Sequence, residues 1–299
     1  MVKVRVPAST ANLGSGFDCM GIALNLYTQA TFEETDSGVE IIINDPSSEF
    51  LPKDETNYVY KAMTRVFDKA GIYPKGVRIT SHTDIPMTRG LGSSSASLAL
   101  GLFGANEMIG RPFGKDDLLD IAYEIEGHAD NVTPCIMGGF TVSVADNAKV
   151  MYTKTDVPSN IRFAAMIPDF YLSTKKARNL LPKFVPHKNA VFNVAHAAYM
   201  ASAVAKGDFS SFGVGTKDRL HQRYRFNMIK SAEYIIRCAR RNGAMCGYLS
   251  GAGPTIISVL DSNYDAFEKA MNGIIESNLK NWSLRMFSAD NDGVVCENL

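Results

Sequence analysis

The chain has 299 residues, 45% of them hydrophobic and 21% charged, which is typical of a globular protein large enough for two domains. Its 31 basic and 31 acidic side chains balance to zero without a basic stripe, so neither a nucleic acid nor an anionic membrane is expected as a partner. No signal-peptide core or run of 18 apolar residues occurs, and five scattered cysteines without a Cys-x-x-Cys pair suit a reducing cytoplasm.

The first half of the chain mixes strand and helix patterns. Hydrophobic periodicity and turn residues predict its elements in chain order. They are strands at 2–6 (ended by Pro7), 22–34 and 38–45, a helix at 57–70 with Gly71 as C-cap, a strand at 76–82, a buried helix at 95–110, a helix at 115–126 capped near Asp116 and ended by Gly127, and a strand at 138–146.

The second half follows a polar, turn-rich segment at 151–160, which predicts a domain junction. A strand at 161–168, helices at 188–206 and 231–242, a strand entering the segment 249–260, a helix at 264–278 and a strand at 282–288 are expected beyond it. Because strands and helices do not alternate strictly, the pattern indicates two α+β domains, at residues 1–155 and 156–299.

A candidate phosphate-binding loop lies in "IPMTRGLGSSSASLAL", residues 85–100. Glycines, three serines and the start of a buried helix would offer an anion unpaired backbone N–H groups and the positive end of a helix dipole. No lysine follows Gly92, so the segment is not a Walker A loop. Ser95 stands where a dinucleotide-binding loop has its third glycine, and Pro86 interrupts any strand leading into the loop. Taken alone, the segment could equally be a serine-rich N-cap of a core helix.

Further motifs accompany this loop. "PASTANLGSGFDCMG" (7–21) and "LSGAGPTIISV" (249–259) are also glycine-rich, and "EGHADNVTPCIMGGF" (126–140) and "LSTKKARNLLP" (172–182) lie between them. In this order the motifs resemble those of the GHMP kinases, and within that superfamily those of the homoserine kinase family. The resemblance extends to the final segment "SADNDGVVCENL" and so covers essentially the whole chain.

The resemblance implies a fold, a reaction and a nucleotide site. It implies an N-terminal domain like domain 2 of ribosomal protein S5 and a ferredoxin-like C-terminal domain. It implies transfer of the γ-phosphoryl group of ATP, with Mg²⁺, to the hydroxyl of L-homoserine on the route to threonine. The triphosphate would be wrapped by Pro86, Met87, Thr88, Arg89, Gly90, Leu91, Gly92, Ser93, Ser94, Ser95 and Ala96. Backbone donors, the helix dipole and magnesium would replace the missing lysine.

Magnesium prefers hard oxygen ligands. The helix before "GHADN" offers Asp120, Glu124 and Glu126 as candidate ligands. Glu124 and Glu126 point about 200° apart on a helix, so only one of them can face the nucleotide. The resemblance favours Glu124, which would act in catalysis as a metal ligand together with Ser93, and Glu126 is the alternative.

The acceptor would be a zwitterionic amino acid, whose carboxylate suits the planar fork of arginine. Arg178 and Arg225 match the family's carboxylate-binding arginines, and Arg223 is a rival because it replaces a proline of the family pattern. The resemblance also assigns Asn12, Asp18, His128 and Asn131 to substrate binding. By themselves, Asp18 would be a turn carboxylate and His128 a helix C-cap.

Asn131 suggests the mechanism. Mevalonate and galactose kinases carry an aspartate near this place as a general base, whereas an amide cannot take up a proton at neutral pH. The sequence therefore predicts catalysis by alignment and charge stabilisation, with Asn131 orienting the substrate hydroxyl. Asp130 as a base is a minority alternative. Cys19 and Cys135 have no histidine partner and are expected to be structural.

Three other functions stay open. A related kinase of another alcohol, such as mevalonate, is disfavoured by Arg178, Arg225 and the "HADN" element. A non-catalytic ligand sensor on the same fold is disfavoured by the intact phosphate loop and magnesium carboxylates, and an RNA-binding relative by the zero net charge. Many relatives are dimers, and the sequence leaves both the oligomeric state and inhibition by threonine open.

Overall fold

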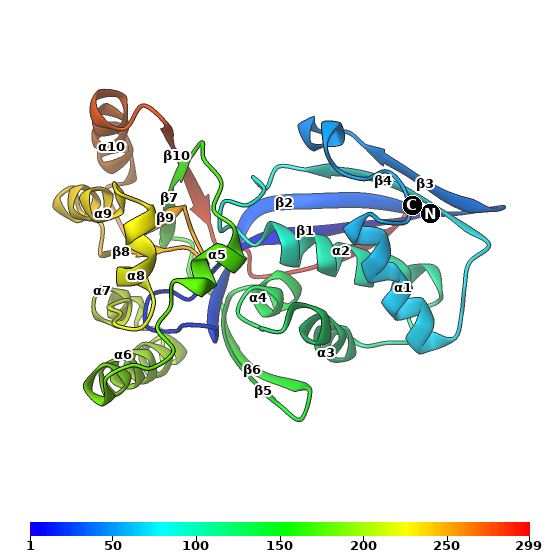
Figure 1. Ribbon diagram of the computed structural model, residues 1–299, viewed down its shortest axis with the longest axis horizontal. Coiled ribbons are helices and arrows are strands. Elements are labelled where there is room, and N and C mark those ends of the chain that lie inside the picture. The colour runs from blue at the N-terminus through cyan, green and yellow to red at the C-terminus, as the bar shows by residue number, and fades with distance from the viewer.

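The computed structural model describes residues 1–299 and contains two sheets side by side (Figure 1). The first sheet has the order β11-β1-β2-β4-β3, and a β5–β6 hairpin extends it through β5 and β2. Its strands are β1 (Val2–Ala11), β2 (Met20–Thr35), β3 (Gly38–Ile43), β4 (Gly76–Thr83), β5 (Phe140–Asp146), β6 (Lys149–Thr155) and β11 (Val295–Asn298).

The first strand is longer than the sequence pattern predicts. We expected Pro7 to end it, but β1 continues to Ala11, and that expectation is wrong. The pairing of β1 with β2 shifts register between Pro7 and Ala8. A bulge of this kind tolerates a residue without an N–H group, so the strand passes through the proline. The extension carries residues 8–11 toward the second sheet.

Helices cover the first sheet on one face (Figure 1). They are α1 (Tyr58–Ala70), α2 (Ser93–Met108), α3 (Lys115–Glu126) and α4 (Val132–Met137), with a short 3-10 turn at Pro46–Glu49. Helix α2 packs closely between α1 and the sheet. The absence of a Cβ atom at Gly101 lets the carbonyl of Val59 in α1 approach, and its absence at Gly104 makes room for the ring of Phe32 in β2. Gly71 and Gly127 end α1 and α3 in left-handed conformation, as predicted. The N-cap of α3 is Gly114 and not Asp116.

The second sheet has the order β10-β7-β9-β8, with every neighbouring pair antiparallel. Counted along the chain this is the order 4-1-3-2 of a ferredoxin-like domain, which confirms the predicted α+β fold class. Its strands are β7 (Arg162–Pro168), β8 (Cys246–Leu249), β9 (Ile256–Leu260) and β10 (Trp282–Ser288). The helices of this half of the chain are α5 (Thr174–Asn179), α6 (His187–Ala205), α7 (Phe212–Gly215), α8 (Gln222–Arg225), α9 (Ala232–Arg241) and α10 (Tyr264–Asn278). Two 3-10 turns lie at Phe209–Ser211 and Phe226–Met228.

Strand β7 joins the two hydrophobic cores. Its side chains alternate between faces, so Ala164 and Met166 pack in the cluster under α9 and α10, whereas Phe163, Ala165 and Ile167 belong to the main core. The main core also contains the buried residues of β1, β2 and α2. The second sheet is therefore packed on both faces.

The boundary between the sheets differs from the predicted junction. Residues 151–155 belong to β6, so the chain first crosses between the two sheets at residues 156–161. After β10 the chain returns to the first sheet, where β11 pairs with β1 (Figure 1). No helix has the length and apolar character needed to span a bilayer.

Candidate active site

A cavity of about 480 Å³ contains the residues of most predicted motifs. One end is lined by side chains of β3, β4 and α1 and by the start of α2. The other end is lined by residues from the loop after β1, the "HADN" segment, α5, α8 and the loop after β8. Both halves of the chain therefore contribute residues to a single cavity.

The three glycine-rich segments are hydrogen-bonded to one another beside this cavity. Gly251 donates its N–H to the carbonyl of Ala11 (3.1 Å), and Asn12 Nδ2 donates to the carbonyl of Gly251 (2.8 Å). Ser250 Oγ donates to the carbonyl of Gly90 (2.6 Å). Segments more than 150 residues apart in sequence thus hold each other's backbones in place.

Helix α2 opens onto the cavity at its N-terminus. Met87, Thr88, Gly90, Gly92, Ser93, Ser94 and Ser95 line the cavity, whereas Pro86, Arg89, Leu91 and Ala96 do not. Arg89 instead braces the loop by donating to the carbonyls of Pro168 and Asp169. A 16-residue helix that begins at a serine-lined opening provides backbone donors and a partial positive charge for an anion.

The two candidate metal carboxylates lie on different sides of α3. Glu124 accepts from Lys69 Nζ at 2.9 Å on the surface and does not line the cavity. Glu126 does line it: its Oε1 accepts from Ser95 Oγ at 2.9 Å and its Oε2 from the hydroxyl of Tyr58 at 3.3 Å. The residue that faces the start of α2 is therefore Glu126, the predicted alternative, whereas the favoured Glu124 lies on the surface.

The "HADN" segment lies between α3 and α4 with three side chains at the cavity. Asn131 Oδ1 accepts from Ser9 Oγ at 2.9 Å. His128 Nδ1 lies 2.8 Å from Oδ1 of the buried Asp130. Burial opposes a charge on His128, but the hydrogen bond and negative charge of Asp130 outweigh it and raise the pKa of the imidazole. Asp130 is therefore engaged with a histidine rather than free.

Arg178 and Asp18 form a bidentate ion pair at the cavity. Both Nη–Oδ distances are 2.9 Å. Asp18 has a left-handed backbone (φ 58°), and its N–H donates to Asn12 Oδ1 at 2.9 Å, which fixes the turn that presents the carboxylate. The structure brings these three predicted residues together.

Arg225 and Arg223 lie in opposite environments. Arg225 is 1% exposed and lines the cavity, whereas Arg223 is exposed and lies over the ring of Tyr224. Arg225 forms no ion pair within the protein, and its Nε has no hydrogen-bond partner. Burial lowers its pKa to about 10, so it is charged at neutral pH. Asp18, Asp130 and Asp218 act on this charge through space, but none of them is bonded to the guanidinium, which therefore has donors left for an anionic ligand.

Two groups of residues were not predicted, one that lines the cavity and one that lies behind it. Ile43, Leu51, Tyr58, Val59 and Leu100 supply apolar surface at the end of the cavity formed by β3, α1 and α2, among polar residues that include Asp45, Asn57 and His82. Behind the other end, the buried side chains of Asp218 and His221 contact the loop after β1 and Arg225. The sequence pattern predicts the first group to be ordinary core residues and the second to be part of a polar loop. Neither pattern indicates a functional site.

The comparisons with known proteins agree with this geometry. The family models for the GHMP kinases N terminal domain and the GHMP kinases C terminal match residues 57–139 and 200–272. Homoserine kinase from Caldicellulosiruptor saccharolyticus is 46% identical, with 98% of this chain and 96% of the relative covered. Homoserine kinase from Clostridium botulinum (strain Langeland) is 44% identical, with coverages of 100% and 99%.

The chain belongs to the homoserine kinase family of the GHMP kinases. Among solved structures, homoserine kinase from Cytophaga hutchinsonii superimposes with a TM-score of 0.89 at 29% identity, covering 99% of this chain and 97% of that one. Mevalonate kinase from L. major in complex with R-mevalonate has a TM-score of 0.72 at 16% identity, with coverages of 97% and 96%, and shows a shared fold only. Homoserine kinase family membership confirms the predicted resemblance.

Proposed function

We propose that this protein is a homoserine kinase, which transfers the γ-phosphoryl group of ATP to the side-chain hydroxyl of L-homoserine and forms O-phospho-L-homoserine, a precursor of threonine. The observation that carries the proposal is the buried Arg225, which has no ion-pair partner in the protein, in the same cavity as the serine-lined start of α2. One end of the cavity suits a substrate carboxylate, and the other suits phosphate oxygens.

The end of the cavity formed by β3, α1 and α2 suits the base of the nucleotide. Ile43, Val59 and Leu100 provide apolar surface beyond the start of α2. The triphosphate would then lie against Ser93, Ser94 and Ser95. This order places the γ-phosphate toward the part of the cavity that the "HADN" segment lines.

Magnesium would be held by Glu126, with Ser93 as a further oxygen ligand. The carboxylate of Glu126 is already oriented by Ser95 and Tyr58. No group of three or more His, Cys, Asp or Glu side chains gathers anywhere in the chain. This fits Mg²⁺, which keeps waters and takes phosphate oxygens instead of a full protein cage. Bound magnesium would neutralise charge that develops on the transferred phosphoryl group.

The substrate charges have matching partners. Arg225 and Arg178 would bind the carboxylate, and Asp18 the ammonium group, so that the zwitterion engages the existing Arg178–Asp18 pair. Asn12 and His128 complete the pocket. Mevalonate lacks an ammonium group and would leave Asp18 without this role, which disfavours it as the acceptor.

Asn131 would orient the acceptor hydroxyl, with no dedicated base. Ser9 holds the amide oxygen, and an amide does not take up a proton at neutral pH. Asp130 is bonded to His128, which disfavours it as a base. Alignment and charge stabilisation suffice for a loose phosphoryl-transfer transition state.

The proposal is tested by ATP turnover with Mg²⁺ over a set of acceptors. We expect ADP release with L-homoserine to exceed that with L-serine, L-threonine and mevalonate by at least tenfold, with O-phospho-L-homoserine identified by mass and phosphorus NMR. A preference for mevalonate, or no turnover with any of the four, would contradict it.

A further inference from the structure

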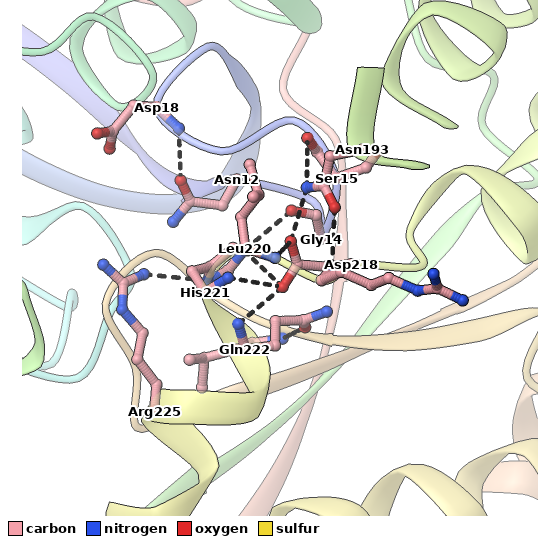
Figure 2. A network of polar contacts seen from close by, with 12 residues as sticks. Asn12, Gly14, Ser15, Asp18, Asn193, Asp218, Leu220, His221, Gln222 and Arg225 are labelled. Carbon is pink, nitrogen blue, oxygen red and sulfur yellow. Dashed lines mark hydrogen bonds and ion pairs between the residues drawn. The ribbon is translucent and has the colours of Figure 1, made fainter. Parts of the chain in front are cut away.

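A buried polar network lies behind the substrate end of the cavity (Figure 2). Asp218 is at its centre, with a fully buried side chain. Its carboxylate accepts from the backbone N–H groups of Leu220 (2.9 Å), His221 (3.0 Å) and Gln222 (2.7 Å) and from Asn193 Nδ2 on α6 (2.7 Å). These bonds fix the turn that leads into α8.

The ionised form of Asp218 is stabilised in this setting. Burial opposes its charge, but the hydrogen bonds from Asn193 and from the backbone N–H groups stabilise the carboxylate, and the pKa of the carboxyl group is lowered. Removing one partner from such a buried network leaves an unsatisfied group and costs about 1–3 kcal/mol. The turn is therefore rigid, and so is the backbone from which His221 projects.

His221 connects this turn to Arg225. Its Nε2 lies 2.9 Å from the carbonyl of Gly14, and its Nδ1 lies 3.2 Å from Arg225 Nη1. A carbonyl oxygen only accepts, so Nε2 carries the hydrogen and Nδ1 has a lone pair for the guanidinium. Burial lowers the pKa of His221, which agrees with a neutral ring at pH 7. Phe17 stacks on the ring with centroids 4.9 Å apart.

Arg225 is oriented through one nitrogen only. Nη1 donates to His221 Nδ1 and to the carbonyl of Gly251 (3.1 Å), whereas Nε has no partner in the protein. Both acceptors are neutral, so they orient the guanidinium without cancelling its charge. A carboxylate in the place of His221 would form an ion pair with Arg225 and weaken its attraction for an anionic ligand.

We propose that His221 is a positioning residue for substrate binding: its neutral imidazole, braced by Gly14 and the Asp218 turn, holds the Arg225 guanidinium in the orientation that receives the substrate carboxylate. This inference rests on the proposed function and adds to it a residue that does not itself touch the substrate. The role depends on the Nδ1 acceptor and not on the bulk of the ring.

Two amide substitutions at His221 distinguish the roles of its two ring nitrogens. His221→Asn keeps an acceptor near the position of Nδ1, whereas His221→Gln places its amide near Nε2 and loses the contact with Arg225. We expect His221→Gln to raise KM for L-homoserine by ~10- to 100-fold, the loss of one hydrogen bond to a charged group. KM for ATP should stay within about twofold, because Arg225 lies at the opposite end of the cavity from the nucleotide. His221→Asn should restore most of the homoserine affinity.

The control is His187→Gln, at the exposed start of α6, which should match the wild type. Equal KM values for L-homoserine in the Asn and Gln variants would overturn the role of His221, as would parallel changes in both substrates. A wild type without homoserine turnover would overturn the proposed function as well, so the two failures are distinguishable. If His221→Gln does not fold, a His221→Asn variant with wild-type melting temperature but at least tenfold raised KM also contradicts the proposal.

Discussion

At the end of α3, two glutamates two residues apart have entirely different surroundings. Glu124 faces solvent and pairs with Lys69 and Arg65, and Glu126 faces the cavity beside Ser95. The helical angle between them required that only one face the site. The side on which the cavity lies depends on how α3 packs against α2, which a local sequence pattern does not contain.

This difference gives a matched pair of variants. Glu126→Gln keeps the size of the side chain but removes the negative charge that we propose binds magnesium, so kcat should fall by ~100-fold or more. Glu124→Gln removes a surface ion pair worth up to about 1 kcal/mol and should leave kcat within about twofold. Steady-state kinetics over a series of Mg²⁺ concentrations measures both. The reverse ranking would restore Glu124 as the metal ligand.

Asn131 is the second residue whose role is open to direct measurement. Asn131→Ala removes the group that we expect to orient the acceptor hydroxyl, so turnover should fall by roughly ten- to a thousand-fold, the range for one positioned donor. Asn131→Asp is the companion variant, because it tests whether a base at this position helps. Wild-type turnover in the alanine variant would remove Asn131 from the mechanism.

At the scale of elements, the start of α2 depends on its neighbours as much as on its own residues. Gly92 is left-handed (φ 69°), and a Cβ atom there would collide with Ser9. Gly71 at the end of α1 has nearly the same backbone (φ 66°) but has no atom within 4 Å of such a Cβ. Substituting Gly71 would therefore impose backbone strain alone, whereas substituting Gly92 would add a steric clash with Ser9.

We predict that Gly71→Ala lowers the free energy of unfolding by ~1–2 kcal/mol, the cost of a left-handed alanine, without changing kinetics. Gly92→Ala should cost more than this and also displace Ser9, which donates to Asn131. KM for ATP should therefore rise and kcat should fall. Urea unfolding and steady-state kinetics of both variants provide the measurement, and equal effects would show that Ser9 moves aside without consequence.

At the scale of the whole molecule, the first and last strands of the chain lie side by side in the same sheet. Strand β11 pairs with β1, so the last residues complete the first sheet and cover an edge that would otherwise be open. Just before it, Val294 is 4% exposed and donates its N–H to the carbonyl of Ile136 at the end of α4. The N-terminal sheet is thus complete only when the C-terminal segment is present.

Deletion of residues 294–299 should therefore lower the free energy of unfolding by roughly 2–4 kcal/mol, from lost burial of Val294 and lost strand pairing. It should also promote association through the exposed edge of β1. Deletion of Leu299 alone, a residue that is 63% exposed, is the control and should have little effect. Thermal unfolding and size-exclusion chromatography test both. A truncated chain as stable as the control would show that β11 is dispensable.

The sequence by itself determined the family, the fold class and most helices and strands. Periodicity and caps are local properties: α1 ends at Gly71 and α10 spans 264–278, as predicted. The motif residues are also local, and most of them line one cavity. Their roles in binding and catalysis stay predictions for the experiments described above.

Only the tertiary structure decided which member of a local set faces the site. It placed Glu126 rather than Glu124 at the cavity, buried Arg225 and exposed Arg223, and carried β1 through Pro7. It also brought Asp218 and His221 behind Arg225, and placed His221 against the carbonyl of Gly14, 207 residues away along the chain. The physical reason is that the direction in which a side chain points, its burial and the pairing of its charge depend on contacts between distant segments. A periodic sequence pattern does not encode such contacts.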